Sequence, residues 1–172
     1  MEENKIMSAQ LKGLLISLFV IIVSIAGYYT ELSFKPWFGW IVNAIFFIAI
    51  IFACVHFANQ KQGYVTFGNV FAHGFKITAV ITVILLAYTI LAMTVLFPEM
   101  KDKIFAMQEA KMEEQGIDSE KIEQGMKFMK NNFMLFMVIF LIFGNLIIGC
   151  IASLIGAAVA KKKPINPLQQ NM

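Results

Sequence analysis

The chain has 172 residues, of which 59% are hydrophobic and only 15% are charged, and its mean hydropathy is +0.72. About a quarter of the residues in soluble domains are charged, so this composition excludes an ordinary soluble domain and indicates an integral membrane protein. The net charge of +3 comes from 14 lysines with no arginine. Because arginine is the residue best suited to bidentate phosphate and nucleic-acid recognition, we expect anionic lipid headgroups as partners and not nucleic acid.

Four uncharged stretches are long enough to cross a lipid bilayer, which needs about 20 apolar helical residues. They occupy residues 13–30, 36–60, 77–98 and 131–160, and we expect the third helix to extend back to residue 68. The first stretch is longer than the apolar region of a signal peptide and lacks an Ala-x-Ala cleavage pattern, so we interpret it as a retained helix. The predicted fold is an all-α integral membrane protein, a single domain over residues 1–172 with four transmembrane helices in a compact bundle.

The connections between the first three stretches carry helix-end and interface signals. Tyr and Trp residues cluster where the first stretch ends and the second begins, which is typical of the headgroup level of a bilayer. Pro36 suits the first turn of the second helix. Thr66 is expected to cap a third helix that continues from about Phe67 to beyond Phe97.

The polar insert 99–130 also has a helical pattern. Gly116 is expected to end one helix, and Asp118 is expected to cap a second helix that continues into the fourth stretch. Apolar residues at steps of three and four form seams that would pair with each other. We therefore predict an extramembrane helical hairpin between helices 3 and 4, whose partner-binding residues are Met100, Ile104, Met107, Ile122 and Met126.

Small and polar residues recur along one face of the fourth stretch, at steps of four, four and three. They are Asn145, Gly149, Ser153 and Gly156. Such a strip lets a second helix backbone approach closely and lets the amide bond across the gap. We interpret it as a helix-packing or partner face, and a substrate or ion path stays open as the alternative.

Two histidines, His56 and His73, lie toward the same predicted side and are weak ligand candidates for a metal or a haem. No carboxylate accompanies them in the flanking stretches, so we expect packing or interfacial roles and no cofactor. Cys54 and Cys150 show no metal-ligand spacing. No stretch contains an internal Asp, Glu or Lys, which argues against proton relays, ion-coupled transport and intramembrane hydrolysis.

Four spans place both termini on one side of a membrane. The run Lys161–Lys163 directly follows the last stretch, and no acidic residue is interleaved with it. The positive-inside bias therefore favours cytoplasmic termini in the cell inner (cytoplasmic) membrane.

Three segments together carry a family resemblance: Tyr64–Lys76, the element Gly116–Glu123 and the Gly-rich fourth stretch that closes on Lys161–Lys163. With these segments the chain resembles a bacterial family of small four-helix inner-membrane proteins, best populated in Bacteroidetes and known as domain of unknown function 4199. The resemblance covers nearly the whole chain. It implies an inner-membrane protein with no assigned activity, so it supplies no catalytic residues.

From these features we expect a non-enzymatic accessory or assembly subunit, whose partners are the lipid bilayer and other membrane proteins or a second copy of the chain. The hairpin and the small-residue face of the fourth helix would bind the partner. One alternative is a small oligomeric transporter or channel lined by Asn43, Thr82 and Asn145. The other is a membrane enzyme acting on lipid-linked substrates, for which the available groups are His56, His73, Lys76 and Glu31.

Overall fold

The computed structural model describes residues 7–164, and this part of the chain contains five α-helices and no strand. The elements are α1 (Ala9–Tyr29), the 3₁₀ turn η1 (Leu32–Phe34), α2 (Pro36–Gln60), α3 (Phe67–Leu91), the π-helical turn η2 (Ala92–Leu96), α4 (Met100–Glu114) and α5 (Ser119–Val159). Four of these helices are long and apolar enough to cross a membrane: α1, α2, α3 extended through η2, and α5. The prediction of an all-helical chain with four candidate spans is confirmed.

Three predicted helix boundaries are also confirmed, each by local hydrogen bonding or backbone conformation. Thr66 Oγ1 accepts a hydrogen bond from the Asn69 amide at 3.1 Å, and Asp118 Oδ1 accepts one from the Glu120 amide at 3.0 Å. Both oxygens satisfy amides that have no partner inside the first helical turn. Gly116 follows α4 with φ +70, a conformation that residues with a Cβ avoid.

Two helix ends differ from the prediction. Helix α1 begins at Ala9 and not at residue 13, because Ser8 caps it by accepting a hydrogen bond from the Leu11 amide at 3.2 Å. Helix α3 with its π turn ends at Leu96 and does not pass Phe97, because Pro98 lacks an amide donor and disfavours helical conformation in the residue before it.

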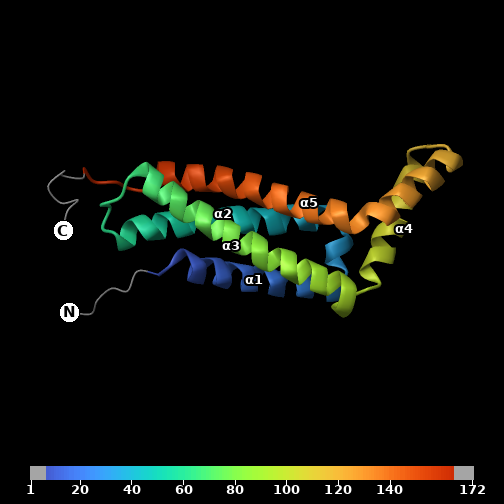
Figure 1. Cartoon of the computed structure of the whole chain (residues 1–172), viewed down its shortest axis with the longest axis horizontal. Helices are drawn as coiled ribbons and strands as arrows, with labels where there is room; N and C mark the ends of the chain where they lie inside the picture. The colour runs from blue at the N-terminus through green and yellow to red at the C-terminus, as the bar shows by residue number, and fades with distance from the viewer. Residues whose placement is uncertain (1–6, 165–172) are drawn as a thin grey trace. The chain divides into compact units, whose positions relative to one another are not determined.

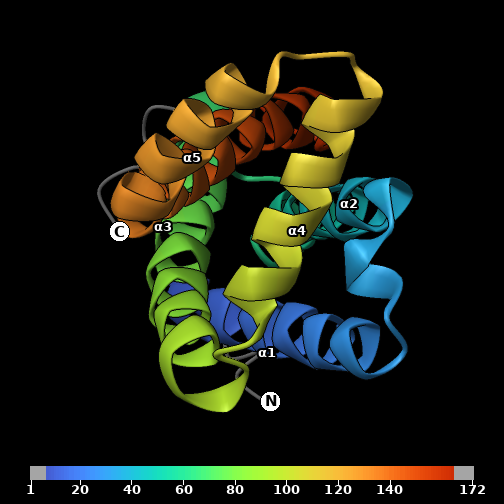
Figure 2. The ribbon, with the colours of Figure 1, turned by 90° about the vertical axis from the view of Figure 1, so that its right-hand side faces the viewer.

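The contacts divide the chain into two compact units, which are described separately. Unit 1 contains the residues up to Leu85 and those from Gly144 onward, and unit 2 runs from Leu86 to Phe143. In unit 1, α1, α2, the first part of α3 and the last part of α5 run side by side (Figure 1). Figure 2 looks along these helices and shows α3 between α1 and α5.

The core of unit 1 combines apolar side chains with hydroxyl groups that bond to their own helices. Fully buried Ile50, Ile77 and Ile81 belong to this core. The buried hydroxyls of Ser17 and Ser153 donate to carbonyl oxygens one turn earlier, at 2.7 and 2.6 Å. Because each hydroxyl is satisfied within its own helix, it can be buried against a neighbouring helix without losing a hydrogen bond.

Unit 2 contains η2, α4 and the first part of α5. The rings of Phe105 and Phe133 meet edge to face, with centroids 5.0 Å apart, and join α4 to α5. Ile122 and Met126 are buried, as expected for the seam on α5. Met107 is 45% exposed, so the predicted seam on α4 does not extend to it.

Candidate functional site

A lysine inside helix α1 is the most unusual residue of unit 1. Lys12 lies in the first turn after the Ser8 cap and is only 5% exposed. Its Nζ donates to the Ala53 carbonyl oxygen of α2 at 3.3 Å, and it lies 3.4 Å from His73 Nε2 of α3. One ammonium group therefore connects three helices.

Two aromatic rings complete the surroundings of this amine. The rings of Phe57 and His73 are stacked, with centroids 4.0 Å apart and planes 9° from parallel. Lys12 Nζ lies 5.8 Å from the Phe57 centroid, within the range of a cation–π contact. When Lys12 is protonated its ammonium has only donors, so the His73 Nε2 beside it would accept and the ring proton would lie on Nδ1.

No carboxylate reaches Lys12 within residues 7–164. The sole acidic residue in the described part of unit 1 is Glu31, which follows the opposite end of α1. The helix rise over the 18 residues from Lys12 to Thr30 is about 27 Å, at 1.5 Å per residue. This separation keeps Glu31 away from His73, so the structure does not bring together the residues that a membrane enzyme was expected to use.

Two pockets open beside the Lys12–His73 pair, and both lie within unit 1. The first has a volume of ≈ 460 Å³ and contains His73 and two lysines; its lining is Met7, Ser8, Ala9, Gln10, Phe57, Lys61, Asn69, Ala72, His73 and Lys76. The second has a volume of ≈ 360 Å³ and is mostly apolar; its lining is Met7, Lys12, Leu15, Ile16, Phe52, Ala53 and His56. His56 and His73 therefore line different pockets, with Lys12 between them.

The lysines that follow α5 lie at the same end of unit 1. The Lys163 amide donates to the Gly63 carbonyl oxygen at 2.9 Å, which attaches this segment to the α2–α3 loop. Lys163 Nζ lies 5.3 Å from the Tyr64 ring centroid, and Lys162 Nζ lies 5.9 Å from that of Phe67. This end of the unit therefore gathers positive charge from α1, α3, the α2–α3 loop and the segment after α5.

The small-residue strip of α5 lies against α2 and α3. A Cβ on Gly149 would collide with the Thr78 side chain of α3, and one on Gly156 would lie 2.6 Å from Cys54 Cβ of α2. Ser153, between them, is fully buried. Contacts inside unit 1 thus take up this surface, and the three residues have little area left for an outside partner.

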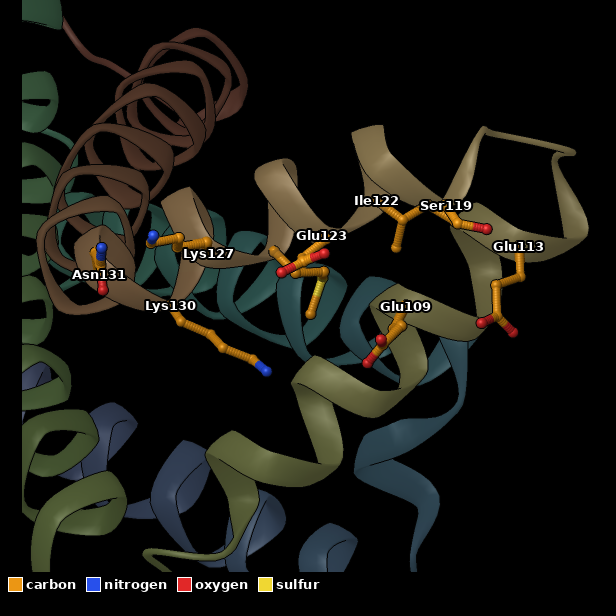
Figure 3. Close-up of a pocket in the computed structure, with 9 residues that line it drawn as sticks. Glu109, Glu113, Ser119, Ile122, Glu123, Lys127, Lys130 and Asn131 are labelled. Carbon is orange, nitrogen blue, oxygen red and sulfur yellow. The ribbon is translucent and has the colours of Figure 1, made fainter.

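The hairpin of unit 2 contains the third pocket, of ≈ 630 Å³. Figure 3 shows Glu109 on α4 and Lys130 on α5 extending toward each other, and Glu113 also lines this pocket. Lys130 Nζ lies 5.7 Å from the Phe105 ring centroid. Carboxylates and amines thus line the same pocket, together with the buried Ile122 and Met126.

The comparison with protein families is decisive for the classification of the chain. The family described as protein of unknown function (DUF4199) matches residues 11–162. The chain belongs to this family. No curated protein and no solved structure compared with the chain matches it.

In this DUF4199 protein the remaining predicted site residues are not gathered into one place. Asn43 is exposed and its Nδ2 donates to the Gly39 carbonyl oxygen at 2.9 Å, whereas Thr82 is buried and donates to the Thr78 carbonyl oxygen. Asn145 is half-buried on α5. Within residues 7–164 no three His, Cys, Asp or Glu side chains are placed to hold a metal ion.

Lys12 is the residue of this DUF4199 protein that the sequence reasoning missed. The first uncharged stretch begins at residue 13, which places Lys12 just outside the first predicted span. The sequence does contain a signal that Lys12 belongs to the helix, because Ser8 is a favoured N-cap residue and a helix that starts after it includes Lys12. The partners of Lys12 on α2 and α3 are 41 and 61 residues away, which no local pattern shows.

Proposed function

We propose that the chain is a multi-pass protein of the cytoplasmic membrane with both termini on the cytoplasmic side. The four long apolar helices support insertion. The gathering of lysines at the end of unit 1 where α1 begins and α5 ends supports the orientation under the positive-inside bias. A reporter fused after the last residue tests this, because a fluorescent protein that matures only in the cytoplasm should fluoresce. Activity of a periplasmic reporter at that position would contradict the orientation.

Within that membrane, the chain serves as a non-enzymatic accessory or assembly subunit that binds another membrane protein through the α4–α5 hairpin. The observation that carries this proposal is the exposure of apolar side chains on the hairpin, outside the four uncharged stretches. Met107 is 45% exposed and Phe128 is 61% exposed. The charged pocket between α4 and α5 adds groups of both signs, which give a partner specificity more than raw affinity.

The test is site-specific photo-crosslinking in cells. A photoreactive residue at Met107 should crosslink to a discrete protein. The matched control is a photoreactive residue at Phe52, which is 70% exposed on α2 in the middle of a candidate span and should crosslink to lipid. Deleting residues 101–124 should leave the remaining chain in the membrane and abolish its association with the crosslinked protein. Recovery of the same protein with the deletion variant would refute the role of the hairpin.

A small oligomeric transporter is the second candidate, and the buried Lys12 is the observation that favours it. Ionisable groups inside membrane-spanning helices commonly mark substrate or ion paths. Reconstituted liposomes test this through a flux that depends on the protein. Lys12→Met should abolish a genuine flux, while Lys35→Met, at the other end of α1, should leave it unchanged. Absence of flux for chloride, phosphate and protons with the unaltered chain would reject this candidate.

A further inference from the structure

Six of the ten residues that line the pocket next to His73 have polar or basic side chains, and all six can donate a hydrogen bond to an anion. Its two lysines and one histidine come from the α2–α3 loop and from α3: Lys61, His73 and Lys76. The N-terminal ends of two helices lie beside it, since Ser8 caps α1 and Asn69 lies in the first turn of α3. Helix N-termini carry a positive partial charge, which adds to that of the lysines. The pocket lining contains no acidic residue.

His73 supplies an unused hydrogen-bond donor on the wall of this pocket. The side chain is only 9% exposed, and its Nε2 is engaged by Lys12. With Lys12 protonated the ring proton would lie on Nδ1, and within residues 7–164 no acceptor is placed to take a hydrogen bond from it. Solvent reaches this nitrogen in the pocket, because within residues 7–164 Gln60 Oε1 is the sole buried side-chain polar atom without a partner, and an anion that accepts there would replace water.

When it is protonated, Lys12 adds a positive charge next to His73 Nε2, and no negative group of the described residues lies beside it. The ammonium has a carbonyl, an imidazole and an aromatic ring as neighbours, and none of them carries a negative charge. A buried cation normally requires an anionic partner nearby. Lys12 itself lines the second pocket, and its charge acts on the first pocket across the His73 ring, whose Nε2 lies 3.4 Å from Lys12 Nζ.

We propose that the pocket lined by Ser8, Lys61, Asn69, His73 and Lys76 binds a phosphate group, with His73 Nδ1 as a donor and Lys76 and Lys61 as charged ligands. Phosphate chemistry has two sources at this position: the headgroup of an anionic phospholipid or inorganic phosphate from the aqueous side. The lipid source rests on the membrane insertion proposed above. The volume of ≈ 460 Å³ is sufficient for a headgroup.

The test uses the two histidines of the chain as probes. The full chain, labelled with ¹⁵N-histidine, is delipidated in maltoside micelles, and the His56→Gln variant assigns the signals. Inorganic phosphate is titrated against chloride at equal ionic strength, and phosphatidylglycerol is titrated against phosphatidylcholine. We expect the His73 Nδ1 resonance to shift with an anionic phosphate compound. A shift with inorganic phosphate identifies the ion as sufficient, and a shift with phosphatidylglycerol alone identifies the lipid headgroup.

Two lysine variants separate a specific site from general surface charge. Lys76→Gln should weaken the titration roughly tenfold, because it removes one charge-assisted hydrogen bond. Lys161→Gln removes the same charge at the same end of unit 1, outside the pocket, and should leave the titration unchanged. The proposal is overturned if neither compound moves the His73 resonance, or if the two variants weaken binding equally. Membrane flotation of each variant is measured separately, so that a failure of insertion is distinguished from a failure of phosphate binding.

Discussion

The contact between α5 and α3 gives the most direct test of the packing in unit 1. Gly149→Ala would place a methyl group against the Thr78 side chain, at a separation that real Cβ atoms do not adopt. Thr78 is fully buried and its Oγ1 donates to the Gly74 carbonyl oxygen at 3.1 Å, so it has no space to move away. Overpacking of this kind costs about 1–3 kcal/mol, and the absence of free space places the cost near the upper value.

A glycine five residues earlier in the same helix provides the matched control. A Cβ on Gly144 would meet no atom within 4 Å. Alanine is favoured over glycine in a helix by about 1 kcal/mol, and this gain applies to both substitutions. Gly144→Ala should therefore stabilise the protein slightly, whereas Gly149→Ala should lower the free energy of unfolding by about 2 kcal/mol after the same gain is subtracted.

The assay is equilibrium unfolding in detergent micelles, followed by the fluorescence of Trp37 and Trp40, the two tryptophans of the chain. Both lie on α2 and report on unit 1. Thr78→Ala removes the two atoms that lie nearest to a Cβ on Gly149. The double variant should therefore be about 1 kcal/mol more stable than the sum of the two single substitutions predicts. Equal stability of the two glycine variants would refute the close approach of α5 and α3.

Two further substitutions test local structure. Asp118→Ala removes the acceptor of the Glu120 amide and should lower the stability of the helix start by about 1 kcal/mol. The loss should appear as faster hydrogen exchange of the amides in the first turn of α5. Unchanged exchange would show that the cap contributes nothing. Gly63→Ala places a Cβ on a backbone with φ +85 and at 3.3 Å from Lys163 Cγ, which should loosen the attachment of the lysine segment to the α2–α3 loop. Trypsin should therefore cleave after Lys161–Lys163 several-fold faster than in the unaltered chain. Gly39→Ala, whose Cβ would meet no atom within 4 Å, should be cleaved at the rate of the unaltered chain.

Much of the fold follows from local sequence signals. The apolar stretches predict four helices because a helix of about 20 uncharged residues satisfies its own backbone groups in lipid. Thr66 and Asp118 mark helix starts because a short side-chain oxygen reaches the free amides of the first turn. These signals act within four residues of one another, so one sequence is sufficient to interpret them.

The candidate site depends on contacts that are remote in sequence. Lys12 and His73 are 61 residues apart, and their approach depends on which faces of α1 and α3 meet. The spacing of Gly149, Ser153 and Gly156 predicts a surface suited to close approach, but the identity of the helix that fills it depends on tertiary packing. Met107 has the same spacing as its seam neighbours and stays exposed, because Phe105 makes the aromatic contact with α5.

The π turn at the end of α3 has a consequence for changes in chain length. The Phe97 amide donates to the Ala92 carbonyl oxygen at 2.7 Å, five residues back, so this turn holds one residue more than an α-helical turn. Removing one residue between Ala92 and Leu96 would restore α-helical register without breaking the helix. Phe97 would stay on the same helix face and keep its 9% exposed position in unit 2, because four α-helical residues close the turn that five residues close in the π-helix. Single-residue deletions in this turn are therefore expected to leave both helix content and the burial of Phe97 intact, whereas a two-residue deletion would rotate Phe97 by about 100° around the axis.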